Sequence, residues 1–289
     1  MVEFDIDRAE EVLIEPFKER GEEVLERYSC LLYQNDLFKV VPEDESLEKK
    51  YMLALVSVLF DSQKESRKNY KWFSRIYQAE PDYFNLDVLL EEEDEELQMF
   101  AKEMSSPYKK GSYLFRDINI IKEEYEGKVK NLFDEDVVET RERIMELPGF
   151  GEGLSSLLVH TVRDQGFHTF YNEEDFVPKI DFHDYNIGIV SGIIKNPDML
   201  NSAKDKKEYA YFLNELAKDN EVNIFDLDNF TWIIGQICNE KNKAMCEDYC
   251  PISHTYSNPR AFAMENQYRE RSTKVRNHKR LLAFQKNLF

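Results

Sequence analysis

The stretch LPGFG at residues 147–151 decides the fold, because it separates two segments with helical periodicity. Charged and apolar residues recur with helical spacing in residues 136–146, and the helical pattern resumes in residues 154–162. Proline ends the first helix, while the two glycines permit a positive φ and a close approach to another backbone. The stretch therefore predicts a hairpin of two helices, and an ordinary connection between antiparallel helices would give the same pattern.

Helical periodicity extends outward from this turn over most of the chain. The segment Tyr51–Phe60 is apolar on nearly every side, which predicts a buried central helix. Alternation with a period of two residues is scarce and confined to short pieces such as residues 176–180. The sequence thus predicts an all-α fold. Besides the hairpin and the central segment, we expect helices in residues 7–29, 119–130, 185–194, 204–218 and 227–238.

The charge of the chain is large and unevenly distributed. The 289 residues carry 57 acidic and 38 basic side chains, a formal net charge of −19. This total argues against a nucleic-acid partner, because phosphate contacts are electrostatic. However, residues 260–289 hold eight Lys or Arg against two Glu, a net +6 that leaves −25 for the remainder, and further basic residues follow Gln63. Local basic surfaces can therefore exist on this acidic protein.

Composition excludes several classes of protein. A hydrophobic fraction of 42% is enough for a core, and no apolar run reaches the length of a membrane span. The first residues, MVEFDIDRAEEV, are acidic and unlike a secretion signal. Four cysteines are too few for a disulfide scaffold of this size. We therefore expect an intracellular protein of the cytoplasm, nucleoid or nucleus, monomeric and without a membrane partner.

A second motif follows the hairpin by about thirty residues. Val177-Pro178 precedes Ile180-Asp181-Phe182-His183 after the second hairpin helix. The order LPGxG, helix, proline and (V/I)-D-x-H resembles the helix-hairpin-helix Gly/Pro…Asp superfamily of DNA glycosylases, of which endonuclease III is the best-known type. Further segments resemble the family in the same order, so that the resemblance runs from about residue 50 to residue 256. These segments are residues 52–64, 108–121 and 230–238.

The resemblance implies an all-α, two-domain helix-hairpin-helix DNA glycosylase fold. Residues 50–165 would form a helical barrel domain that carries the hairpin. Residues 1–49 and 166–258 would form a second helical domain with a cysteine loop. Residues 259–289 would be a basic C-terminal arm on DNA. Asp181 would face the cleft between the two domains.

The resemblance also implies base-excision repair of double-stranded DNA that contains a damaged or mismatched base. Asp181 would be the catalytic carboxylate, which stabilises an oxocarbenium-like sugar and activates water while the N-glycosidic bond is hydrolysed. Asp181 would also suit the N-cap of the following helix, and the two roles are compatible. His183 would be a structural hydrogen-bond partner.

Several residues are expected to contact the DNA. Gln63 would fill the gap left by the flipped base, although a solvated helix end is the alternative reading of this residue. Basic side chains after Gln63 would flank the duplex, and hairpin amides would hold a phosphate. The expected DNA-binding residues are Gln63, Lys64, Lys68, Gly149 and Gly151.

Two departures from the family pattern limit the implied activity. Gly153 stands where bifunctional members carry a lysine nucleophile, which implies a monofunctional glycosylase without lyase activity. Lys179 is the nearest alternative amine in the motif. Leu59, or its neighbour Val58, stands where adenine-glycosylase relatives carry glutamate, which disfavours mismatched adenine as the substrate.

The cysteines depart from the family pattern as well. The family loop is C-x6-C-x2-C-x5-C, whereas this chain has Cys238-x7-Cys246-x3-Cys250 and no fourth cysteine nearby. A [4Fe–4S] cluster usually requires four thiolates, and Cys30 would supply the fourth from a distance, with His254 as a second option. A zinc site and a loop of reduced, buried thiols remain alternatives to the cluster.

Two other classes of function stay open. One is a non-catalytic protein of the same fold that binds DNA structures. The other is an N-glycosidase that acts on a small nucleoside or on RNA, which would suit the acidic bulk of the chain.

Overall fold

The computed structural model describes residues 2–29, 32–61, 66–93, 95–97, 99, 109–197 and 202–239. The chain divides into two compact units, here named the terminal unit (Met1–Arg27 with Ile180–Phe289) and the central unit (Tyr28–Lys179). The boundaries lie at 27/28 and 179/180, whereas the family resemblance suggests 49/50 and 165/166. Within the described ranges the secondary structure is mostly helical, as the periodicity predicts.

The central unit is built around α4 (Leu47–Leu59), which contacts α5 (Ser66–Ala79), α8 (Lys109–Glu124) and α10 (Glu152–Asp164). Every side chain of α4 from Tyr51 to Leu59 is buried, so the prediction of a central apolar helix is confirmed. The remaining described helices of the unit are α3 (Tyr33–Phe38), α6 (Leu86–Leu89) and α9 (Val137–Glu146), with 3-10 turns at η3 (Pro81–Phe84), η4 (Val129–Leu132) and η5 (Glu173–Asp175).

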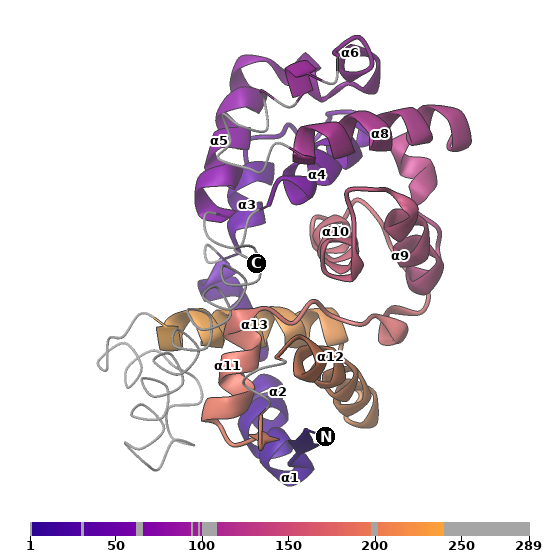
Figure 1. Ribbon diagram of the computed structural model, residues 1–289. Helices are drawn as coiled ribbons and strands as arrows, with labels where there is room; N and C mark the ends of the chain where they lie inside the picture. The colour runs from indigo at the N-terminus through magenta and orange to yellow at the C-terminus, as the bar shows by residue number, and fades with distance from the viewer. Residues whose placement is uncertain are drawn as a thin grey trace, which may run out of the picture. The chain divides into compact units, whose positions relative to one another are not determined.

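The LPGFG stretch joins α9 to α10, and the two helices lie side by side (Figure 1). Leu147 and Phe150 turn inward and are buried, which anchors the connection to the core of the central unit. Gly149 is also buried, and a Cβ added there would lie 2.4 Å from Leu59 Cδ1 and 2.6 Å from Asp117 Oδ2. Neither Gly149 nor Gly151 has a positive φ, so close approach is what requires glycine at position 149.

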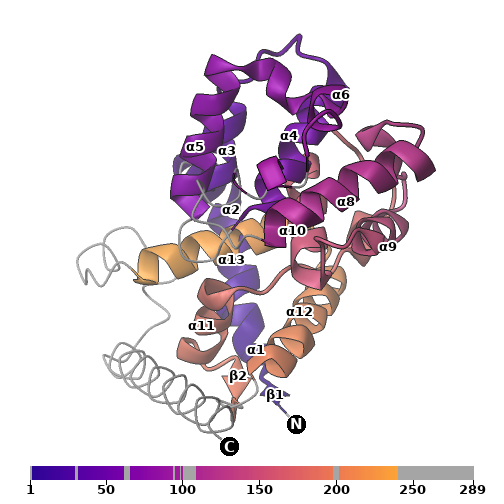
Figure 2. The same ribbon diagram turned by 45° about the horizontal axis from the view of Figure 1, so that its top comes forward.

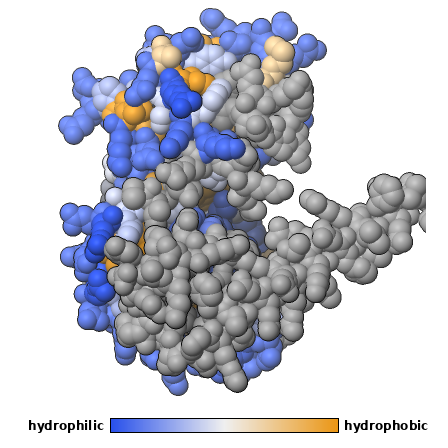
Figure 3. All heavy atoms as spheres, turned by 90° about the vertical axis from the view of Figure 1, so that its left-hand side faces the viewer, coloured by the Kyte–Doolittle hydropathy of each residue, from blue (hydrophilic) through white to orange (hydrophobic). Residues whose placement is uncertain are grey.

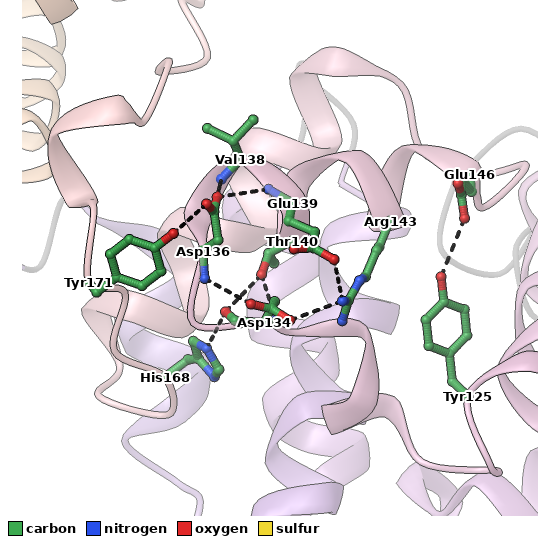
Figure 4. A network of polar contacts seen from close by, with 10 residues as sticks. All are labelled: Tyr125, Asp134, Asp136, Val138, Glu139, Thr140, Arg143, Glu146, His168 and Tyr171. Carbon is green, nitrogen blue, oxygen red and sulfur yellow. Dashed lines mark hydrogen bonds and ion pairs between the residues drawn. The ribbon is translucent and has the colours of Figure 1, made fainter.

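A polar network fixes the start of α9 (Figure 4). Asp136 is the N-cap, and its Oδ1 accepts the backbone N–H groups of Val138 and Glu139 at 2.7 and 3.0 Å. Tyr171 donates its hydroxyl to Asp136 Oδ2 at 2.8 Å. These donors lower the pKa of Asp136 to about 2, with the Glu139 amide as the largest cause. The hairpin helix is therefore held at its first turn as well as at the glycine turn.

In the terminal unit, α13 (Ile224–Asn239) packs against α11 (Phe182–Val190) and against α2 (Glu15–Arg27), as Figure 2 shows. Two short strands, β1 (Glu3–Phe4) and β2 (Ile194–Lys195), pair antiparallel. The other described elements of this unit are α1 (Ile6–Ala9), the π-helix η1 (Glu10–Ile14) and α12 (Ser202–Asp219).

Some element boundaries differ from those predicted. The helix expected in residues 185–194 begins earlier, at Phe182, and ends at Val190. Its end follows from Gly192, whose φ of +84° lies in the left-handed region that terminates helices. The helix expected in residues 119–130 is already present at Lys109 and ends at Glu124.

On the face shown in Figure 3, hydrophobic residues occur in small groups between hydrophilic ones. Among the described residues, no helix combines the length and the apolar character needed to cross a lipid bilayer.

We expect Gly149→Ala to destabilise the protein, because the added methyl group would overlap with Leu59 and Asp117 in a packed core. Overpacking of this kind costs about 1–3 kcal/mol. Gly153→Ala is the matched control, since the nearest atom to its added Cβ is a Lys179 side-chain carbon at 3.6 Å. Thermal unfolding measures both variants, and equal stability of the two would contradict the packing role of Gly149.

Candidate functional site

Asp181 is the N-cap of α11. Its Oδ1 accepts the backbone N–H groups of His183 at 2.5 Å and Asp184 at 3.3 Å. In return, Asp184 Oδ2 accepts the backbone N–H of Asp181 at 3.1 Å, which completes a capping box. The structural role expected for Asp181 is therefore confirmed, while its side chain remains partly exposed.

The second carboxylate oxygen of Asp181 is held by a different helix. Trp232 on α13 donates its indole N–H to Asp181 Oδ2 at 3.0 Å. The Trp232 ring meets the His183 ring edge-on, with centroids 6.0 Å apart. Both oxygens of Asp181 thus have donors, and the orientation of the carboxylate is fixed by α11 and α13 together.

A glycine allows these two helices to approach closely. A Cβ added at Gly235 would lie 2.8 Å from backbone atoms of His183. His183 Nδ1 lies 3.4 Å from the carbonyl oxygen of Gly235, in agreement with the structural role expected for this histidine. Gly235 stands three residues after Trp232, so both lie on the face of α13 that meets the start of α11.

Two buried acids, Asp184 and Asp228, and the buried Tyr209 interact electrostatically in the terminal unit. Asp184 is fully buried, and burial together with the charges of Asp181 and Asp228 raises its pKa well above the usual range. Burial raises the pKa of Tyr209, and the charges of Asp184 and Asp228 act in the same direction. A raised pKa favours the protonated form of Asp184.

The two expected phosphate-binding glycines have different environments. The Gly149 N–H donates to Asp117 Oδ1 at 3.2 Å and is buried, so the contacts of Gly149 support a packing role. Gly151 is exposed, is the N-cap of α10, and would meet nothing within 4 Å if it carried a Cβ. Its φ of −112° suits any residue, so neither packing nor backbone conformation requires glycine there. A small residue at this place leaves the start of α10 open to approach from outside.

Lys179 lies over Gly153 near the start of α10. The Cγ, Cε and Cδ atoms of Lys179 are 3.6, 3.7 and 3.8 Å from the position of a Cβ built on Gly153. A methyl group at position 153 would therefore make ordinary van der Waals contact with the lysine side chain. Within the central unit, the side chain of Lys179, which follows Pro178, thus lies against the first turn of α10.

The other expected site residues have less structural context. Lys68 is exposed on α5, as a phosphate-contacting lysine must be, whereas Gln63 and Lys64 lie outside the described residues. Cys238 belongs to the last turn of α13. Cys30, Cys246, Cys250, His254 and the basic arm 259–289 lie outside the described residues, so the iron–sulfur cluster stays a prediction. Among the residues that are described, no group of three or more His, Cys, Asp or Glu side chains could hold a metal ion.

Asp117 is the buried acid behind the hairpin turn. Burial raises its pKa from 3.8 to about 7, while the Gly149 N–H and the charges of Lys110 and Arg116 act in the opposite direction. Its Oδ2 has no hydrogen-bond partner among the described residues. The hairpin therefore rests on a carboxyl group whose protonation changes near neutral pH.

Sequence reasoning assigned no role to Trp232, Gly235, Asp184 or Asp117. Asp181 and Asp184 have the three-residue spacing of a capping box, which is a signal readable from sequence. The spacing of Trp232 and Gly235 is a weaker signal, because one face of a helix does not name its partner. Asp117 carries no local signal, since its burial depends on the turn packed against it.

We expect the stability of the protein to fall between pH 5 and pH 8 because of Asp117. The folded state keeps the proton up to about pH 7, while the unfolded chain releases it near pH 3.8, so rising pH favours unfolding in this window. The loss amounts to about 3 kcal/mol. Denaturant unfolding at both pH values should show this loss in the wild type and in Asp219→Asn, an exposed control. Asp117→Asn should lose about 3 kcal/mol less than the wild type between these pH values, because only the contribution of Asp117 is removed, and parallel curves for all three proteins would contradict the assignment.

Neither a protein-family model nor a curated protein matches the chain.

Proposed function

We propose that the protein is a DNA glycosylase of the helix-hairpin-helix type that hydrolyses the N-glycosidic bond of a flipped, damaged base, with Asp181 as its catalytic carboxylate. The observation that carries the proposal is the environment of Asp181. The carboxylate is partly exposed, yet N–H donors from two helices hold both of its oxygens. An N-cap alone requires a donor contact to one oxygen, so the second contact supports a role beyond capping.

The geometry of Asp181 suits the chemistry of base removal. Departure of the base leaves an oxocarbenium-like sugar, which a nearby carboxylate stabilises. The same carboxylate can accept a proton from the water that attacks the sugar. Each carboxylate oxygen has two lone-pair directions, and Oδ2 uses one of them for Trp232. The other lone pair of Oδ2 would serve the sugar or the water.

The hairpin supports DNA as the partner. The exposed Gly151 begins α10 without a side-chain cap, and the amides of a helix start favour a phosphate group. Lys68 adds an exposed positive charge on another helix of the central unit. Contacts of this kind hold a DNA backbone without reading its sequence.

We expect Asp181→Asn to lower the rate of base release by about 100- to 10,000-fold, because the amide cannot take up a proton. Asparagine is as good an N-cap as aspartate, so the loss of stability should come mainly from the missing Trp232 contact and amount to about 1–3 kcal/mol. The measurement is base release from a panel of DNA duplexes that each carry one damaged or mismatched base. Asp219→Asn, an exposed carboxylate of α12, is the control and should keep full activity.

Other outcomes of this experiment would overturn the proposal. Unchanged release in Asp181→Asn would remove Asp181 from the reaction. Duplex binding by a wild type that releases no base would favour a non-catalytic DNA-binding protein. Release from free nucleosides or RNA but not from duplexes would favour the N-glycosidase alternative.

The contact between Lys179 and Gly153 favours a second candidate, a glycosylase with lyase activity. The family resemblance puts the amine nucleophile of bifunctional members at position 153, and the side chain of Lys179 covers that position here. In this reaction the lysine amine would attack C1′ of the sugar, and the base would leave with the electron pair of its bond and take up a proton. The amine would give up a proton and the C1′–O4′ bond would open, so that a protonated imine links protein and DNA.

We expect a monofunctional enzyme, and borohydride, which reduces such an imine to a stable amine, tests this directly. Wild-type protein incubated with its substrate duplex and borohydride should yield no covalent adduct on a denaturing gel. An adduct that is lost in Lys179→Gln and kept in Lys122→Gln would establish the second candidate instead. Lys122 is an exposed lysine of α8 and serves as the matched control.

A further inference from the structure

The indole of Trp232 completes the set of donors around Asp181. The backbone N–H groups of His183 and Asp184 both bind Oδ1, which leaves Oδ2 to be fixed by a contact from elsewhere. Trp232 provides this contact from α13, at 3.0 Å. We propose that Trp232 is the positioning residue of Asp181, which holds the carboxylate in the one orientation that serves the reaction. The inference rests on the proposed catalytic role of Asp181.

The chemistry of the indole suits this task. An indole N–H is a donor only, so it can pair with a carboxylate oxygen in just one way. It is also uncharged, whereas a lysine or arginine at this place would bring a positive charge that competes with the developing charge on the sugar. The edge-on contact with the His183 ring limits rotation of the indole and keeps its N–H directed at Oδ2.

The backbone of the terminal unit sets the distance between the two groups. Trp232 is attached to a helix that approaches the first turn of α11 closely at Gly235, where a Cβ would overlap with His183. The carboxylate is attached to the N-cap of α11. Rigid helices thus carry both partners, and such support gives a more precise geometry than loops do.

Trp232→Phe separates the hydrogen bond from the packing, because phenylalanine keeps an aromatic ring and removes the N–H. Loss of a hydrogen bond to a charged group should lower the single-turnover rate of base release by about 10- to 100-fold. The dissociation constant for an uncleavable duplex should stay within about two-fold of the wild-type value, because the variant leaves the hairpin intact. The chain contains two tryptophans, so Trp72→Phe is the matched control and should retain the wild-type rate.

A second measurement does not depend on activity. In the proton–nitrogen spectrum of protein with labelled indoles, two indole signals are expected, and the two Phe variants assign them. In Asp181→Asn the single amide oxygen caps α11, and an NH2 group faces the indole in place of the charged acceptor, so the indole proton of Trp232 should move upfield while that of Trp72 stays in place. An unchanged Trp232 signal would overturn the proposal, as would an undiminished rate in Trp232→Phe.

A double variant distinguishes failure of this inference from failure of the proposed function. If Trp232 acts through Asp181, Trp232→Phe should have no further effect on the residual rate of Asp181→Asn. If the Trp232 indole signal responds to Asp181→Asn but the wild-type protein releases no base, the contact exists without a catalytic role, and both proposals are refuted. Base release that depends on Asp181 and not on Trp232 would refute the positioning role alone.

Discussion

The close contact between α11 and α13 at Gly235 is the constraint on which the candidate site depends. With an ordinary side chain at this place, the helices would have to move apart, and the Trp232 indole would move away from Asp181. α11 is only nine residues long and begins at a capping box, so its own stability depends on the carboxylate that we assign to catalysis. The fold and the proposed chemistry therefore use the same side chain, and the requirements of helix capping already keep the carboxylate in place.

In the central unit, a glycine likewise allows close packing at the hairpin. Gly149 lets the turn lie against Leu59 of α4 and Asp117 of α8, and its N–H is used by Asp117. The exposed glycine of the turn, Gly151, is free of such internal demands. One glycine thus attaches the turn to the core, and the other leaves the start of α10 accessible. This division explains how a five-residue stretch can be packed against the core and still leave the start of a helix exposed.

Helical periodicity predicted most of the fold because it reports local amphipathic patterns. The buried α4 and the two hairpin helices could be recognised in this way, since their apolar patterns and the proline between the hairpin helices are local features of the sequence. The end of α11 at Val190 was missed, because a left-handed glycine two residues later ends the helix although the apolar pattern continues. Of the candidate site, sequence identified Asp181 and its capping role. Trp232 and Asp117 could not be recognised, because their importance arises from contacts with residues far away in the sequence. Trp232 is 51 positions from Asp181, and Asp117 is 32 positions from Gly149.

The buried acids have a consequence for handling the protein in solution. Burial raises the pKa of Asp117 and of Asp184. Both carboxyl groups therefore destabilise the folded protein least at acidic pH, where they are protonated. The isoelectric point of the chain is near 4.8, and proteins associate most readily where their net charge vanishes. The acidic pH that protonates the buried carboxyl groups therefore approaches the pH at which the protein is most prone to precipitate. A buffer slightly below neutral pH keeps a substantial negative net charge while Asp117 still holds its proton, and it balances colloidal solubility against conformational stability.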